Sequence, residues 1–232
     1  MNQFVAWALG LLCIGGSLAA QAQDADALLK RVKEKLAAIN DYQAEGVMKT
    51  DVPFMKVPES KVTIWYKKPD KFRIKKQDGI SIVPKGGVNI NMSALFAGNN
   101  YTAVPAGKGQ VNGAEVTIIK LLPLDENSDV VVSTLYIDEK EALVKRSVIT
   151  TRENGTYEME MRYGKYKARG LPDTILFIFA TKDYKLPKGL AFDYETGSTP
   201  KQPNTNGNQK GKIEISYSAY SINKGIADSV FQ

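Results

Sequence analysis

Carboxylates and amines are the only reactive side chains that this chain offers in number. It contains no histidine, and its single cysteine is Cys13. Without histidine, the Ser-His-Asp and Cys-His nucleophile systems are excluded. The usual zinc and copper ligand sets, which rely on histidine and cysteine, are absent too. What remains is carboxylate chemistry, a lysine nucleophile or calcium bound by oxygen ligands.

The acidic residues do not form the arrangements that such chemistry needs. A glycosidase requires two carboxylates that flank a cavity, but Glu158 and Glu214 alternate with apolar residues and so fall on the polar face of their strands. Asp125, Glu126 and Asp129 lack the spaced ligands and the glycine of a dedicated calcium loop, and a polar turn explains them. We therefore expect a protein that is not an enzyme and that holds no metal or cofactor.

The first residues carry the pattern of an export signal. Residues 1–23 contain no charged side chain, and their apolar run ends in Ala20-Gln21-Ala22, the small-x-small pattern of a cleavage site. The run is shorter than the about 20 apolar residues that span a bilayer, which favours cleavage over a membrane anchor. We therefore expect a signal peptide at 1–22 and one mature domain at 23–232, located in a bacterial periplasm.

Two further features concern the exported chain. Leu12, just before Cys13, is not the small residue of a lipoprotein signal, so the mature domain is expected to lack both lipidation there and disulfides. The formal net charge is +6. In an exported protein this charge favours an acidic protein partner or an anionic membrane surface over nucleic acid; the alternative is a basic surface that is simply solvated.

The expected elements are one helix followed by many strands. From Asp24 to Asn40, apolar residues recur at spacings of three and four, with Asp24 or Asp26 as the N-cap. Later the apolar period changes to two, which is typical of half-buried antiparallel strands. We expect roughly ten strands by this alternation. The predicted class is α+β, dominated by antiparallel sheet.

Three segments depart from the alternation. Residues 175–180 are apolar on both faces, which predicts a strand that is covered on both sides or that lies where the sheet folds over on itself. Met92, Leu95 and Phe96 are expected to form a short helical turn or flap. Residues 196–211 have nothing to bury and predict a mobile surface loop.

The predicted sheet has more apolar surface than the predicted helix can cover. Ten strands extend about 48 Å across, and strands of about 17–20 Å give an apolar face on the order of 900 Å². A helix about 25 Å long and about 10 Å wide shields roughly 250 Å² of it. The sheet could close into a filled barrel, split into a sandwich, or curl into a half-barrel around an apolar hollow that binds a ligand.

Short motifs resemble one family. The segment WYKKPDKFR, Trp65 to Arg73, is similar to a stretch of periplasmic lipoprotein carriers of the LolA type. The helix followed by residues 42–46 resembles the start of that family, and residues 217–231 resemble the end of its lipoprotein-sorting relatives. The resemblance implies an unclosed half-barrel with a helical lid over an apolar cavity for acyl chains. It also implies loading by an inner-membrane ABC transporter and release to an outer-membrane acceptor.

Alternation and resemblance together give the candidate site. The cavity is expected to be lined by inward apolar residues: Leu36, Ile64, Tyr66, Phe72, Ile74, Met159, Met161 and Phe177. The family's residue at the position of Phe72 takes part in lid contact and in the transporter interaction, although an ordinary core residue is the alternative here. The flap residues Met92, Leu95 and Phe96 are expected to belong to the lid.

Lys68 stands where the family carries an arginine that latches the lid. Lysine keeps the charge but loses the planar fork that bonds two carbonyls at once. A solvated lysine beside a turn is therefore the alternative to a latch. The outward cations are expected to dock an acidic partner or anionic head groups, or else to form a solubilising face: Lys67, Lys71, Arg73 and Lys75.

These observations predict a monomeric, non-catalytic periplasmic carrier. It would shelter the acyl chains of lipoproteins or free lipids and move them from the inner to the outer membrane. The alternative on the same scaffold is an envelope regulator that senses lipid or lipoprotein and signals to a membrane partner.

Overall fold

The computed structural model describes residues 16–52, 55–77, 95–96, 100–153, 155–180 and 210–231. Side chains are described from residue 23 onward within these ranges, apart from those at 55 and 56. Most of the predicted signal peptide, the flap residue Met92 and most of the predicted loop at 196–211 lie outside the described residues.

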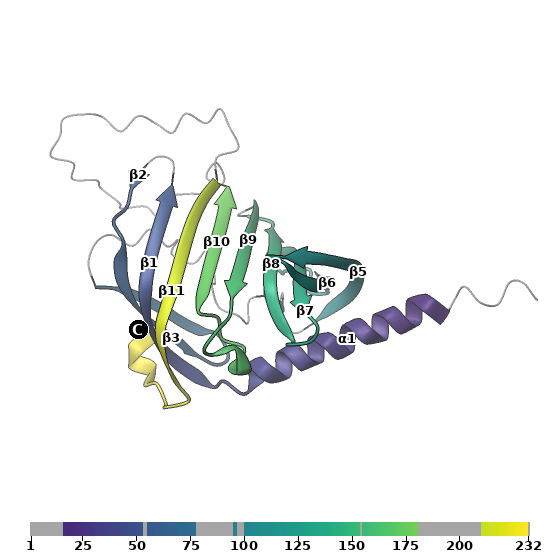
Figure 1. Cartoon of the computed structure of the whole chain (residues 1–232), viewed down its shortest axis with the longest axis horizontal. Coiled ribbons are helices and arrows are strands. Elements are labelled where there is room, and N and C mark those ends of the chain that lie inside the picture. The colour runs from purple at the N-terminus through teal and green to yellow at the C-terminus, as the bar shows by residue number, and fades with distance from the viewer. Residues whose placement is uncertain are drawn as a thin grey trace, which may run out of the picture.

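One antiparallel sheet forms the body of the protein (Figure 1). Its strands lie in the order β4-β3-β1-β11-β10-β9-β8-β7-β6-β5, and β2 pairs with β1 beside this path. The strands are β1 Asp41–Val52, β2 Met55–Lys56, β3 Ser60–Lys67, β4 Lys71–Lys76, β5 Tyr101–Val111, β6 Ala114–Pro123, β7 Val130–Asp138, β8 Leu143–Thr151, β9 Gly155–Arg162, β10 Thr174–Ala180 and β11 Lys210–Ile222. Since β4 and β5 stand at the two ends without pairing in the described part of the chain, the sheet is unclosed. The predicted α+β half-barrel is confirmed.

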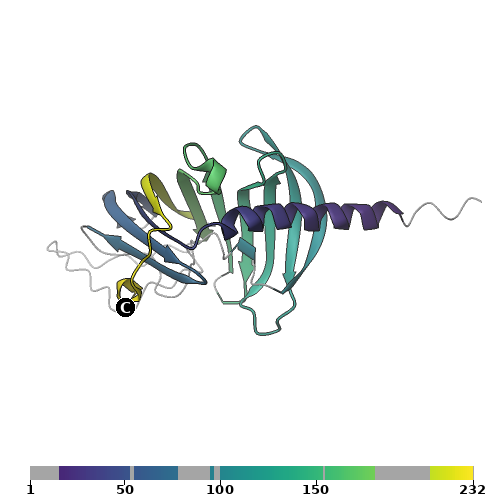
Figure 2. The ribbon, with the colours of Figure 1, turned by 90° about the horizontal axis from the view of Figure 1, so that it is seen from below.

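The alternation along the strands sets which residues share a face. Ile64 pairs with Ile74, Tyr66 with Phe72, and Met159 with Phe177. Directly opposed residues project to the same side of a sheet. We call this buried side the concave face, because the sheet curls around it (Figure 2).

Strand β10 lies in the middle of the sheet, and its two faces differ. Phe177 and Phe179 are buried on the concave face, whereas Leu176 and Ile178 on the other side are half-buried. The prediction that both faces of β10 are covered is therefore fulfilled on the concave side and only partly on the convex side. On the convex side Leu176 lies between two glutamates of the neighbouring strands, whose side chains leave part of it exposed.

A bulge in β11, where Ser218 is the extra residue opposite Glu45 and Gly46 of β1, adds curvature next to the sheet's centre. The register between β1 and β11 shifts between Glu45 and Gly46. A Cβ on Gly46 would collide with the backbone carbonyl of Ser216, so the two strands can approach this closely only at a glycine. Bulges increase local twist and bend the strand, which helps the sheet to curl.

Helix α1 (Gly16–Ala37) crosses one end of the curled sheet (Figures 1 and 2). Its apolar stripe, including Leu28 and Val32, is buried. The predicted start at Asp24 is wrong, because residues 18–23 are Leu, Ala and Gln, which all favour helix. Asp24 therefore lies inside the helix and is not its N-cap. In the described part of the chain, no helix combines the length and apolar character needed to cross a membrane.

Cationic side chains tie α1 to the turn between β7 and β8. Arg31 Nη2 donates to the carbonyl of Lys140 at 3.5 Å, and Lys35 Nζ donates to that of Glu141. The seam between α1 and the start of β8 has no room for a water molecule. The helix is thus fixed to the end of the half-barrel and leaves the middle of the concave face to other segments.

Candidate functional site

The predicted cavity residues lie in one cluster on or beside the concave face. Ile64, Tyr66, Met159, Met161 and Phe177 are buried. Phe72 and Ile74, on the edge strand β4, are half-buried and pack against the same cluster. Leu36 also contacts this cluster, but it does so from α1 and lines the closed seam with β8.

The predicted flap residues Leu95 and Phe96 form a short helical turn that is buried in this cluster. Leu95 is 0% exposed and Phe96 5%. Ser133 Oγ on β7 donates a hydrogen bond of 2.7 Å to the Leu95 carbonyl. The Lys33 ammonium of α1 lies 5.4 Å from the Phe96 ring centre and 4.5 Å from that of Tyr101. The Leu95–Phe96 turn therefore connects the helix with the concave face.

A group of tyrosines lines the concave face near the end of α1. The ring centres of Tyr42 and Tyr66 are 5.3 Å apart, and Tyr220 lies 5.4 Å from Tyr42 and 5.0 Å from Tyr217. Tyr220 also donates 2.8 Å to the carbonyl of Pro172. Of this group, only Tyr66 was predicted to line the cavity, although the alternation along β11 also places Tyr217 on the apolar face. Tyr42 and Tyr220 join them through the pairing of β1 with β3 and β11, which period alone does not predict.

Burial makes ionisation of Tyr42, Tyr217 and Tyr157 less favourable. It raises the pKa of Tyr42 and of Tyr217 well above the ordinary tyrosine value, and the neighbouring phenols raise that of Tyr42 further. Burial likewise raises the pKa of Tyr157, deeper on the same face, to about 12. At physiological pH the tyrosines therefore present apolar rings with uncharged hydroxyl tips, which suits the boundary between hydrocarbon and polar groups.

Lys68 bonds to the end of α1. Its ammonium donates to the carbonyl of Ala37, and its backbone N–H donates 2.9 Å to the carbonyl of Asn40. Asn223 Nδ2 donates 2.8 Å to the neighbouring carbonyl of Ala38. Cations are favourable where a helix leaves free carbonyls at its C-terminus. Among the described residues, the hydrogen bonds of Lys68 thus go to the C-terminal end of the helix and not to the Leu95–Phe96 turn.

Several solved structures share the fold described above. No protein-family model and no curated protein matches the sequence. A putative outer membrane lipoprotein-sorting protein domain from Vibrio parahaemolyticus is similar, with 12% identity, 91% of this chain and 97% of that chain covered, and a TM-score of 0.58. A LolA superfamily protein from Nitrosomonas europaea follows with 8% identity, 90% and 97% coverage, and a TM-score of 0.55. A DUF1329 family protein from Desulfovibrio piger has 10% identity, 91% and 97% coverage, and the same TM-score.

This chain has a LolA-like fold. The resemblance first seen in the WYKKPDKFR segment is thereby confirmed for the architecture as a whole, over nine tenths of the chain. Within this LolA-like fold, WYKKPDKFR is the hairpin of β3 and β4 at one end of the sheet.

The basic residues of that hairpin bind the chain's own C-terminal turn, η4 (Asp228–Phe231). Lys67 Nζ lies 2.7 Å and Lys71 Nζ 3.0 Å from the carboxylate of Asp228. Arg73 Nη1 donates to the carbonyl of Val230. Lys75 is exposed on the same convex side. A partner that docks on the predicted basic face would therefore have to compete with η4 for three of its four cations.

Asp228 is expected to control this contact. Hydrogen bonds from Lys67 and then Lys71 lower the pKa of the Asp228 carboxyl. Because the pKa of Asp228 is lowered, its contact with Lys67 and Lys71 is fully present at pH values above the ordinary pKa of 3.8. The contact is lost as the pH falls through the lowered pKa. Asp228→Asn should speed amide hydrogen exchange in η4 at pH 7 with little change in the thermal midpoint. Unchanged exchange would show that backbone contacts alone hold the turn.

The acidic residues lie outside the concave face, as alternation predicted for Glu158 and Glu214. Glu158 pairs with Arg146 and with Lys210, and Glu214 pairs with Arg162 at 2.9 Å. The described residues contain no cluster of acidic side chains that could hold a metal ion. Glu158 and Glu214 are therefore ion-pairing residues of the convex surface.

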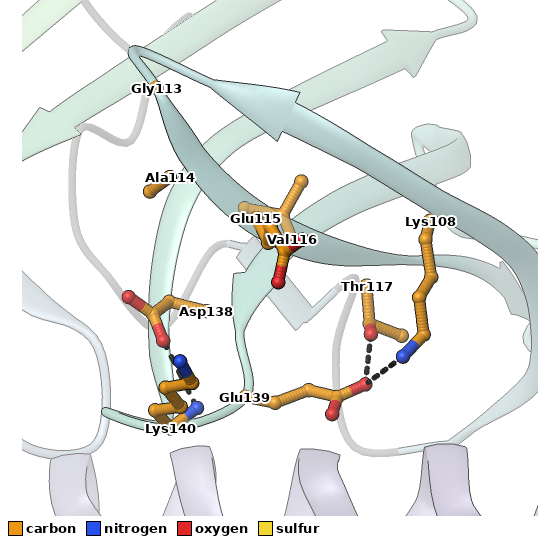
Figure 3. A pocket seen from close by; sticks show the side chains of 9 residues that line it. All are labelled: Lys108, Gly113, Ala114, Glu115, Val116, Thr117, Asp138, Glu139 and Lys140. Carbon is orange, nitrogen blue, oxygen red and sulfur yellow. Dashed lines mark hydrogen bonds and ion pairs between the residues drawn. The ribbon is translucent and has the colours of Figure 1, made fainter.

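A polar depression of about 430 Å³ lies between the β5–β6 hairpin and the β7–β8 turn (Figure 3). Thr117 donates to Glu139, which also lies 3.9 Å from Lys108. Asp138 Oδ1 accepts the N–H groups of Lys140 and Glu141 that close the turn. Several polar groups here bond to one another, and the lining offers little apolar surface to an acyl chain.

Proposed function

We propose that this protein is a carrier that shelters the acyl chains of lipoproteins or lipids on its concave face. One observation carries the proposal. The Leu95–Phe96 turn, together with the single long helix, covers the concave face, and a buried hydrogen bond from Ser133 holds the turn to β7. A cover of this size is suited to replacement by a ligand.

The energies involved are similar in size. Burial of a leucine or phenylalanine side chain contributes about 1.5–3 kcal/mol, and burial of one methylene about 0.8 kcal/mol. A few acyl methylenes therefore offset the displacement of Leu95 and Phe96. Exchange between the two side chains and an acyl chain can therefore proceed in either direction. A carrier needs this reversibility in order both to load and to release its cargo. Among the described residues, β4 and β5 at the two ends of the sheet have no further strand beside them, which would allow the sheet to widen.

In this proposal the chain works in the bacterial periplasm as a monomer after cleavage of residues 1–22. An inner-membrane ABC transporter loads it, and an outer-membrane acceptor takes the cargo. The basic β3–β4 hairpin is suited to acidic surfaces on such partners, since complementary charge speeds encounter. No step of this cycle requires a catalytic residue or a cofactor.

A transfer assay tests the function. Donor vesicles carry a fluorescent diacylated lipopeptide, acceptor vesicles carry none, and the purified protein is added at a small molar fraction of the lipopeptide. We expect transfer to accelerate in proportion to protein concentration. A rate equal to that without protein, at every concentration, would contradict the proposed function.

A further inference from the structure

Two serines interrupt the apolar concave face where β7 and β8 pair. Ser133 and Ser147 are both 0% exposed. Their cross-strand neighbours are fully buried apolar residues, Leu121 and Ile149 for Ser133, and Leu135 and Met159 for Ser147. Two hydroxyl groups are thus embedded in the hydrocarbon layer that the proposed ligand would contact.

The two hydroxyls differ in their hydrogen bonds. Ser133 Oγ donates to the carbonyl of Leu95. Ser147 Oγ has no hydrogen-bond partner within the described part of the chain. A buried hydroxyl without a partner is destabilising, since it loses its bonds to water and gains none. Alanine would fill the site of Ser147 without that penalty, so the hydroxyl calls for an explanation beyond folding.

We propose that Ser133 and Ser147 form a polar anchor for the linkage carbonyls of ester- or amide-linked acyl chains, and that the Leu95 carbonyl occupies part of it when no ligand is bound. This inference rests on the proposed function and specifies its ligand class. The Leu95 backbone carbonyl belongs to an amide flanked by two hydrocarbon side chains. It therefore has the same chemistry as the acyl linkage that would replace it.

The chemistry of a buried hydroxyl selects among lipids. It can donate one hydrogen bond to a neutral carbonyl. It cannot offset the desolvation of an ionised carboxylate, so a free fatty acid gains little from it. A pure hydrocarbon chain has no acceptor and leaves the hydroxyl unpaired. Ester- and amide-linked chains alone bring a neutral carbonyl together with hydrocarbon.

The spacing of the serines suits two acceptors. Ile149 faces Ser133 and Leu135 faces Ser147, so the two serines are diagonal neighbours on adjacent strands. Diagonal positions in an antiparallel pair lie about 7–8 Å apart. Each hydroxyl can then reach a different carbonyl, which fits a ligand carrying two acyl linkages side by side.

The test compares a diester phosphatidylglycerol with its diether analogue of equal chain length. Occupancy of the purified protein is measured by native mass spectrometry after incubation with vesicles of each lipid. We expect the wild type to prefer the diester about three- to tenfold, which lies in the range of one net hydrogen bond. Ser147→Ala should lower this ratio toward one while the thermal midpoint of the ligand-free protein stays the same or rises. Ser133→Ala should lower the ratio too.

Ser216→Ala is the matched control, because Ser216 is an exposed serine on the convex side of β11. It should leave the ratio unchanged. A wild type that binds both lipids equally, or a Ser147→Ala variant with the wild-type ratio, would overturn the anchor and leave the carrier function standing. A wild type that takes up neither lipid would remove the proposed function and this inference together.

Discussion

Phe72→Glu is expected to slow lipopeptide transfer about tenfold or more while the protein remains folded. Phe72 is half-buried on the edge strand β4, opposite Tyr66 and on the face that holds Ile64 and Ile74. At an edge, a glutamate can turn its carboxylate to solvent in the empty protein, so folding survives. Once acyl chains cover this face, the same carboxylate must lose water without a partner, and ligand binding becomes unfavourable.

Lys75→Glu provides the matched control on the same strand. Lys75 projects to the convex side and is exposed, so a glutamate there changes the charge of β4 without touching the concave face. Its transfer rate should stay within about twofold of the wild type, because exposed charges contribute little. Equal rates for Phe72→Glu and the wild type would reduce Phe72 to an ordinary edge residue and remove β4 from the ligand site.

Phe177→Ala is expected to cost about 3–5 kcal/mol in the free energy of unfolding. Phe177 is 2% exposed in the central strand β10, with its ring centre 5.2 Å from that of Tyr157 and 5.4 Å from that of Phe179. Its removal leaves a cavity in the middle of the concave face, and the neighbouring rings can fill it only partly. Urea denaturation followed by circular dichroism measures the loss.

Ile178→Ala, one residue further along β10, tests the opposite face. Ile178 is half-buried on the convex side, so its truncation should cost clearly less than that of Phe177. If the two costs were equal, the concave face would not be the main source of stability. If added diacyl lipid restored part of the stability lost in Phe177→Ala, the ligand would be filling the same space.

The strands and their inward residues were predictable from sequence because a period of two is a local property. Ile64, Tyr66, Met159 and Met161 all lie where alternation placed them, and the curved sheet has the predicted class. The start of the helix was not predictable from capping residues alone, since the Leu, Ala and Gln residues before Asp24 continue it.

Features that depend on pairing between distant segments were not predictable from the sequence. The tyrosine group forms because β1 pairs with both β3 and β11, far apart in the chain. The contact of Ser133 with Leu95 joins a strand to a turn that alternation could not place. The basic residues of β3 and β4 were predicted to dock a partner or to form a solubilising face, because nothing local shows that Asp228 folds back onto Lys67 and Lys71.

The most direct test of the carrier account is native mass spectrometry of the protein isolated under gentle conditions from a bacterial envelope. We expect a fraction of the molecules to carry a discrete added mass that organic extraction identifies as an acylated species, and we expect this mass to be lost in Phe72→Glu but kept in Ser216→Ala, which alters an exposed residue outside the basic hairpin. A protein that carries no such mass, and acquires none after incubation with a diacylated lipopeptide, would contradict it.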